Sequence, residues 1–192
     1  MKIKKITMLS FLSLLLITGC GEKETTDESS STQTKKEVAP QFNFTTVLGK
    51  PITITAEQEG WKFAGIENKV VLVNFFGTWC PPCIAEIPHL NNIRSKVNED
   101  FEILSVDIGP RSGGVNSQEH LEEFIQKHSI TYPIVSGTNA KKLFAAVSDL
   151  NKSSSVPFMI LFNKQGQYVK YYIGMKPEEM LFNDINATIK MQ

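Results

Sequence analysis

The 192-residue sequence predicts an α/β fold built around a largely parallel sheet. Residues 70–76 form a nearly continuous apolar run, which is typical of a parallel strand buried on both faces. From this run onward, strand-like segments alternate with segments of helical periodicity, and that alternation predicts parallel strands joined by helices. The composition, with 41% hydrophobic residues and 20 basic against 20 acidic side chains, fits a single globular domain.

Residues 1–19 are predicted to be a signal peptide. Three lysines among the first five residues precede an apolar run at residues 6–17, which is shorter than the roughly 20 residues needed to cross a bilayer. The run ends in small residues before Cys20, and it resembles the bacterial lipoprotein signal in which this cysteine is lipidated and becomes the mature N-terminus. The alternative is an ordinary signal peptide followed by a chance cysteine.

Residues 20–38 are predicted to be a lipidated N-terminus and a flexible tether. Residues 21–38 hold eight charged side chains and a run of three serines, so the segment cannot bury enough apolar surface to offset its ordering entropy. Without residues 1–19 the chain has 17 basic and 20 acidic side chains. A net charge of −3 without a basic cluster argues against nucleic-acid binding.

Residues 39–192 are predicted to be the folded domain. Residues 42–47 and 51–55 are β-prone around a Leu-Gly-Lys turn and are expected to form a hairpin. After strand 70–76 a helix is expected, with a kink at Pro88 and an apolar stripe formed by Ile84, Ile87, Leu90, Ile93 and Val97. A strand over 101–107 and a helix around Leu121, Phe124 and Ile125 are expected next. A strand over 132–136 and a helix carrying Leu143, Phe144, Val147 and Leu150 are expected to follow.

The end of the chain breaks the alternation. Strand-like residues 158–162 and 167–173 are separated by only four residues, too few for a crossover helix, so they are expected to form an antiparallel hairpin. Pro177 followed by two glutamates predicts the start of the last helix, because proline needs no N–H partner there and acids suit the positive end of the helix dipole. Residues 109–117 are the longest polar interruption of the pattern.

Cys80 and Cys83 fall where the buried strand meets the following helix. A helix N-terminus offers unpaired N–H groups and a positive dipole end, which favour the thiolate that attacks in thiol–disulfide exchange. Two intervening residues allow the two sulfurs to bond within one turn. We therefore expect Cys80 to be the exposed attacking cysteine and Cys83 to resolve the mixed disulfide.

Three other uses of this cysteine pair compete with exchange chemistry. A purely structural disulfide would close a very short loop and so add little stability. A structural zinc site needs four ligands, and the chain has no second cysteine pair. A copper site would recruit Met159, Met175 or a histidine, since sulfur ligands suit copper. Of the histidines, His89 is expected to point away from Cys83, and His120 and His128 are expected to be exposed; no metal site is predicted.

The motifs resemble a known family. The strand of residues 71–76, the Gly-Thr-Trp-Cys-Pro-Pro-Cys stretch ending at Cys83, the Glu-Ile-Pro continuation and the later Val156-Pro157-Phe158 are similar to the TlpA/ResA/DsbE family of membrane-tethered, thioredoxin-like thiol:disulfide oxidoreductases. The resemblance spans about residues 39–190. It implies a thioredoxin-like fold with an N-terminal β-hairpin and a central α-β insertion, and no cofactor besides a redox-active Cys80–Cys83 disulfide.

The resemblance also implies substrate contacts. Pro157 matches the family's cis-proline, which lies against the redox pair while the backbone of Val156 pairs with an extended substrate. Trp79, Pro81 and Pro82 are expected to contact the substrate as well. Trp61 and Phe63 are candidates for lining the substrate groove, with ordinary core packing as the favoured interpretation.

Two polar positions bear on the mechanism. Thioredoxin has a buried acid where this chain has Asn74, and an amide cannot accept the proton that Cys83 must lose. Asn74 is therefore given a supporting role, and Glu86, one turn beyond Cys83, is the candidate base, directly or through water. The alternative is that Glu86 only complements the helix dipole or an ion pair.

The two prolines bear on direction. Pro81 and Pro82 have no N–H to stabilise a Cys80 thiolate, so the pair is expected to be a reductant, with a potential nearer thioredoxin's roughly −270 mV than the oxidant extreme near −120 mV. The resemblance implies apocytochrome c as a target, a membrane donor relaying electrons from cytoplasmic thioredoxin, and a lipid-anchored extracytoplasmic location. An envelope oxidase or isomerase, and a copper-binding or chaperone module, remain open.

Overall fold

The computed structural model describes residues 39–191. The signal peptide, Cys20 and the tether predicted for residues 1–38 lie outside the described residues and stay predictions. Within the described range, no helix is both long and apolar enough to cross a membrane.

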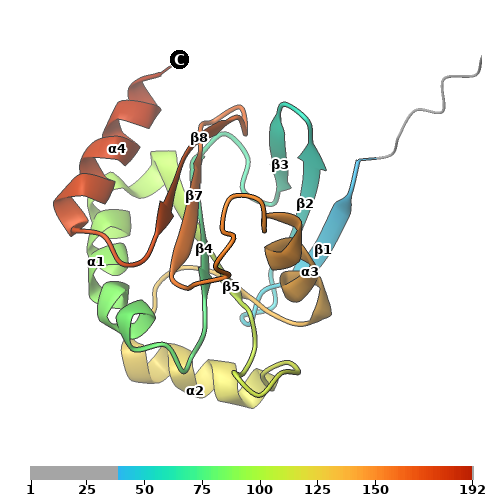
Figure 1. Cartoon of the computed structure of the whole chain (residues 1–192). Helices are drawn as coiled ribbons and strands as arrows, with labels where there is room; N and C mark the ends of the chain where they lie inside the picture. Colours follow the sequence, from blue (N-terminus) through green and yellow to red (C-terminus); the bar gives the residue numbers. More distant parts are fainter. Residues whose placement is uncertain (1–38, 192) are drawn as a thin grey trace, which may run out of the picture. The chain divides into compact units, whose positions relative to one another are not determined.

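A five-stranded sheet forms the centre of the domain, in the order β6-β5-β4-β7-β8 (Figure 1). The parallel part pairs β4 with β5 and β5 with β6, whereas β7 runs antiparallel to β4 and β8 antiparallel to β7. The parallel strands and the terminal hairpin match the prediction, whereas the prediction of a largely parallel sheet is corrected by β7, which follows a helix and yet lies antiparallel to β4. The strands are β4 (Val70–Phe76), β5 (Phe101–Asp107), β6 (Ile134–Val135), β7 (Phe158–Phe162) and β8 (Tyr168–Ile173).

Helices cover both faces of this sheet (Figure 1). Apolar side chains of α1, α2 and α4 pack in one buried cluster, and those of α3 pack with the N-terminal strands in a second cluster. All seven residues of β4 are buried between the two clusters, as the continuous apolar run predicts. The helices are α1 (Pro81–Val97), α2 (Gln118–His128), α3 (Thr138–Ala146) and α4 (Glu178–Lys190), with a 3₁₀ turn η1 (Asn98–Asp100).

The N-terminal hairpin has a third strand that the sequence pattern did not predict. β1 (Gln41–Thr45) pairs with β2 (Pro51–Glu57), and β2 also pairs with β3 (Gly60–Ala64). The N–H of Trp61 donates to the carbonyl of Gly166 at 2.8 Å, which ties β3 to the β7–β8 turn. A Cβ at Gly60 would lie 2.2 Å from that carbonyl oxygen, so only glycine allows this approach.

Two predicted elements are shorter in the structure. The strand expected over 132–136 is reduced to β6, because Pro133 has no N–H to give to a ladder, although its carbonyl accepts from the N–H of Ser105 at 2.9 Å. The third helix ends at Ala146, and the chain reaches Leu150 through turns. Pro88 lies inside α1, is exposed, and does not end the helix.

Candidate active site

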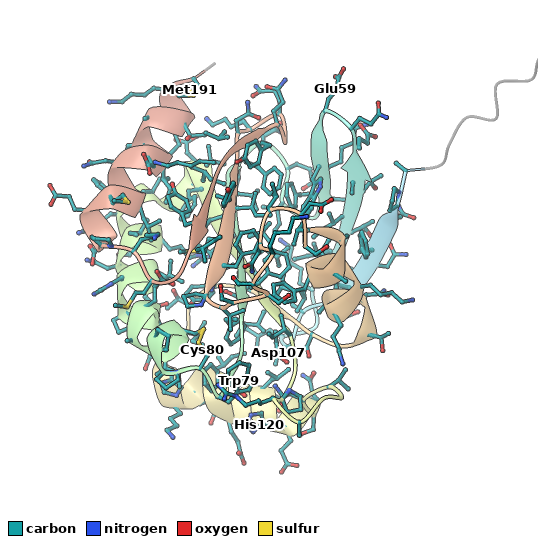
Figure 2. The ribbon with its side chains drawn as sticks, viewed as in Figure 1. Glu59, Trp79, Cys80, Asp107, His120 and Met191 are labelled. Carbon is teal, nitrogen blue, oxygen red and sulfur yellow. A yellow bond between two sulfur atoms is a disulfide. The ribbon has the colours of Figure 1, made fainter. Side chains whose placement is uncertain are left out.

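Cys80 and Cys83 form a disulfide at the N-terminus of α1, with an S–S distance of 2.17 Å (Figure 2). The chain leaves the end of β4 through a turn in which the N–H of Cys80 donates to the carbonyl of Gly77 at 3.0 Å. A Cβ at Gly77 would lie 2.7 Å from the Trp79 indole, so this turn needs glycine. The turn and the start of the helix together place the two predicted redox cysteines side by side.

The expectation that Cys80 is exposed is wrong for this disulfide form. Cys80 is 2% exposed and Cys83 is 4% exposed, and both belong to the buried cluster on the α1 side of the sheet. The reason is packing, since Trp79 and Val156 lie against that cluster and screen the sulfurs. Pro81 and Pro82 are exposed and form the outer surface of the motif.

One backbone amide faces the sulfur of the first cysteine. The N–H of Cys83 points at Cys80 Sγ with an N···S distance of 3.3 Å. The two residues between the cysteines are prolines and supply no N–H. The helix N-terminus thus offers a thiolate at Cys80 an amide partner, but fewer than a motif without prolines would offer.

The peptide bond between Val156 and Pro157 is cis, as the family resemblance implies. The carbonyl oxygen of Val156 lies 3.6 Å from Cys80 Sγ, so this segment is in contact with the redox pair. On its other side, the carbonyl of Pro157 accepts from the N–H of Gly174 at 2.8 Å. The segment is therefore tied to the sheet at the point where it meets the disulfide.

Glu86 is fully buried, one helical turn beyond Cys83. Its Oε1 accepts from the backbone N–H of Lys176 at 3.0 Å, whereas Oε2 has no partner among the described residues. Burial raises the pKa of Glu86 from 4.5 to about 7, against the opposing effects of the amide and the charge of Lys176. A carboxyl group with that pKa is able to exchange a proton near neutral pH.

Asn74 begins a second set of buried polar groups in the same core. Its Nδ2 donates to Ser105 Oγ at 3.1 Å, and its Oδ1 has no partner among the described residues. Burial, followed by the charge of Glu86, raises the pKa of the nearby Tyr132. Sequence reasoning missed Ser105 and Tyr132, although a serine inside an otherwise apolar strand was a usable signal.

Trp79 is held by the long loop of residues 109–117. Its Nε1 donates to the carbonyl of Gly109 at 2.9 Å, and the guanidinium of Arg111 lies 4.5 Å from the ring centroid. Such a cation–π contact adds to the fixing of the ring. The loop that had no assigned role in the sequence therefore positions the residue next to Cys80.

Asp107, at the end of β5, anchors this loop, and sequence reasoning missed it. Its carboxylate accepts from Asn116 Nδ2 at 3.0 and 3.1 Å, from the N–H of Gly109 at 3.2 Å and from Ser136 Oγ at 3.0 Å. Burial raises its pKa, and these hydrogen bonds oppose the rise. The sequence feature that could have identified Asp107 is its position, because it is an acidic residue at the carboxyl end of a parallel strand, where the functional sites of α/β sheets lie.

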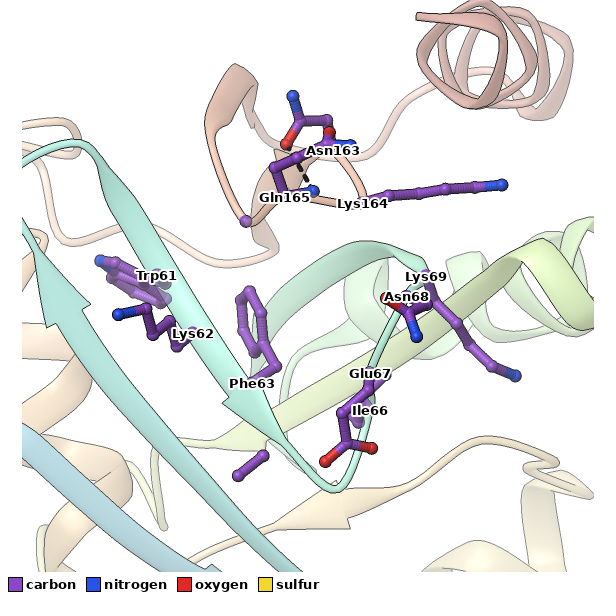
Figure 3. A pocket seen from close by; sticks show the side chains of 12 residues that line it. Trp61, Lys62, Phe63, Ile66, Glu67, Asn68, Lys69, Asn163, Lys164 and Gln165 are labelled. Carbon is purple, nitrogen blue, oxygen red and sulfur yellow. Dashed lines mark hydrogen bonds between the residues drawn. The ribbon is translucent and has the colours of Figure 1, made fainter. Parts of the chain in front are cut away.

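Trp61 and Phe63 lie away from the disulfide. Both pack on Phe162, with ring centroids 4.9 and 5.2 Å from it, so core packing is their role. They border a pocket of about 310 Å³ between β3 and the β7–β8 turn (Figure 3). This pocket is at the opposite end of the sheet, because Phe162 pairs with Val71 at the start of β4 while the cysteines follow its end.

The histidines do not converge on the cysteines. His120 is exposed, as expected, with Nε2 3.1 Å from Thr78 Oγ1. The expectation that His128 is exposed is wrong, because its ring packs on Phe124 and is half-buried. His89 is also half-buried. Residues 39–191 contain no group of three or more His, Cys, Asp and Glu side chains placed to hold a metal ion.

Known proteins are similar to this chain in sequence. The family model described as Redoxin matches residues 34–189. The thiol-disulfide oxidoreductase ResA of Bacillus subtilis is 28% identical over 149 residues, which are 77% of this chain and 72% of that protein. ResA of Halalkalibacterium halodurans is 31% identical over 129 residues, 65% of each chain.

Solved structures show the same fold. A thiol:disulfide interchange protein of the thioredoxin family from Chlorobium tepidum superposes with a TM-score of 0.59 at 22% identity, covering 79% of this chain and 94% of that one. StoA from Bacillus subtilis gives a TM-score of 0.52 at 22% identity, covering 77% and 97%. The predicted thioredoxin-like fold is confirmed.

Proposed function

Because the chain belongs to the Redoxin family and is a thiol:disulfide oxidoreductase, we propose that it reduces disulfides of extracytoplasmic proteins through Cys80 and Cys83. The observation that carries the proposal is the Cys80–Cys83 disulfide at the start of α1, in contact with the cis Val156–Pro157 segment. That segment offers a backbone carbonyl beside the reacting sulfur, where an extended substrate would pair.

In the proposed reaction the reduced protein gives two electrons to the substrate. The Cys80 thiolate attacks one sulfur of the substrate disulfide, and the other substrate sulfur leaves as a thiolate that takes a proton from solvent. Cys83 then loses its proton and attacks Cys80 Sγ. The second substrate thiol is released, and the Cys80–Cys83 disulfide of the structure is the oxidised product.

Glu86 is the proposed acceptor of the Cys83 proton. Its buried carboxyl group, one turn away, has a pKa of about 7 and an Oε2 without a hydrogen-bond partner in the described part of the chain, whereas the Asn74 amide accepts no proton. Replacing Glu86 by Gln should slow resolution of a mixed disulfide at neutral pH. Glu179→Gln, at an exposed acid in α4, is the matched control, and an unchanged rate in E86Q would remove Glu86 from the mechanism.

The two prolines support the proposed reducing direction. A single amide faces Cys80 Sγ, so the Cys80 thiolate is stabilised less than the corresponding thiolate of a strong oxidant. A less stabilised thiolate shifts the Cys80–Cys83 pair toward its disulfide form, which makes the reduced protein a better reductant. Equilibration with a glutathione or dithiothreitol redox buffer measures the potential. A value above about −150 mV would instead favour an envelope oxidase or isomerase.

The proposed location is the outer face of a membrane, with the domain attached through lipidated Cys20. A Cys20→Ser variant should lose acyl-chain labelling and move to the aqueous phase in detergent partitioning. A variant that still partitions with detergent would argue against the anchor.

A reductant in an oxidising envelope needs resupply, so we propose a membrane donor that relays electrons from cytoplasmic thioredoxin, with oxidised apocytochrome c as the target. Acid quenching followed by a thiol-alkylating mass tag reports the state of Cys80 and Cys83 in cells. The pair should be mostly reduced and become oxidised when the donor is removed. A pair that is oxidised with the donor present would refute the reductase direction.

A further inference from the structure

A second pocket lies between the loop that follows β5 and helix α3. Its volume is about 440 Å³. Ile108 and Phe144 give it apolar walls, Arg111 and Lys141 lie at its edge, and Ser154 borders it from the segment that leads to Pro157. Both cationic residues are exposed, and Ile108 and Phe144 are half-buried.

The two cations carry charge that nearby acids do not neutralise. Within residues 39–191 the ion pairs closer than 4 Å include neither Arg111 nor Lys141. The guanidinium of Arg111 lies over the Trp79 ring, and Lys141 Nζ donates to the carbonyl of Gly114 at 3.3 Å. Both contacts hold the side chains beside the pocket and leave them able to pair with an anion.

Two residues that line the pocket connect it to the reaction centre. Ser154 is two residues before Val156, whose carbonyl oxygen lies 3.6 Å from Cys80 Sγ. Arg111 contacts Trp79, the neighbour of Cys80. An extended chain covers roughly 3.3 to 3.6 Å per residue, so a substrate strand lying along Val156 reaches this pocket within a few residues of its reacting cysteine.

We propose that this pocket binds a segment of the substrate protein that carries an Asp or Glu side chain next to an apolar one. The proposal rests on the proposed function, since it defines the substrate class of the same reaction. A carboxylate there forms charge-assisted hydrogen bonds with Lys141 and Arg111, while its apolar neighbour packs on Phe144 and Ile108. The pocket thereby selects disulfides flanked by acidic, partly apolar sequence.

The test uses two disulfide peptides that differ only by Glu or Gln three residues from the reacting cysteine. The reduced protein should oxidise more rapidly with the Glu peptide, and Lys141→Gln should lower kcat/KM for that peptide by a factor of roughly 5 to 10. The rate with the Gln peptide should stay unchanged. Lys142→Gln is the matched control, because Lys142 is exposed on the same helix and does not line the pocket.

Equal rates with both peptides would overturn the proposal, as would equal losses in the Lys141 and Lys142 variants, which would indicate a general surface charge effect. If neither peptide is reduced, the proposed function fails instead. Binding of both peptides to the oxidised protein then tests the proposed pocket independently of the redox reaction. A preference for the Glu peptide that Lys141→Gln abolishes supports the pocket, and the absence of any preference overturns it.

Discussion

The buried carboxyl group of Glu86 should make the stability of the protein fall as pH rises. Its pKa is about 7 in the folded chain, against 4.5 for an exposed glutamate, because burial disfavours the charged form. Between these two pH values the folded protein holds a proton that the unfolded chain has lost. Stability gained from this group is therefore fully present below pH 4.5 and is lost as pH rises through 7.

The size of the effect follows from the shift. A difference of about 2.5 pKa units, at about 1.36 kcal/mol per unit, corresponds to about 3 kcal/mol of unfolding free energy. Glu86→Gln removes the titrating group and keeps an oxygen that accepts from the N–H of Lys176. Relative to the original protein, the variant should therefore gain up to about 3 kcal/mol of stability between pH 4 and pH 8.

Urea unfolding of the oxidised protein, repeated across this pH range, measures the difference directly. Subtracting the free energies of the two proteins removes the contributions of all other titrating groups. Glu179→Gln, at the exposed start of α4, is the control for removing an acid that is not buried. A difference between E86Q and the original protein that does not change with pH would refute the assignment of a raised pKa to Glu86.

Three further substitutions test a hydrogen bond beside the site and two ion pairs away from it. Trp79→Phe removes the hydrogen bond to the carbonyl of Gly109, so it should lower the unfolding free energy by about 1 kcal/mol and slow substrate reduction. A variant with unchanged stability and an unchanged rate would show that the loop does not position Trp79. Arg94→Ala leaves the nearly buried Glu102 without the guanidinium that donates to both its carboxylate oxygens, and it should lower the free energy of unfolding in urea by about 2 kcal/mol. Lys152→Ala removes a solvent-exposed ion pair and should leave the unfolding midpoint almost unchanged. Equal midpoints for these two variants would contradict the assignment of a partly buried ion pair.

Most of the fold follows from local pattern. The apolar run at β4 requires burial on both faces, and the short connection between β7 and β8 requires an antiparallel pair, so both were predictable. β3 was not predicted, although only two residues separate it from β2, because the tendency of a short segment to form a strand depends on the neighbours against which it packs. One of these neighbours, Gly166 in the β7–β8 turn, is distant in the sequence.

The sequence by itself determined the redox pair, its place at a helix N-terminus and the family resemblance, because these depend on residues adjacent in the chain. Only the tertiary structure decided that Cys80 is nearly buried, that Glu86 has no water-exposed surface and that Asp107 anchors the loop beside Trp79. Burial and hydrogen bonding between distant segments depend on how the layers pack. Solvent exposure and pKa therefore belong to the folded molecule, whereas the identity and spacing of the reactive groups belong to the sequence.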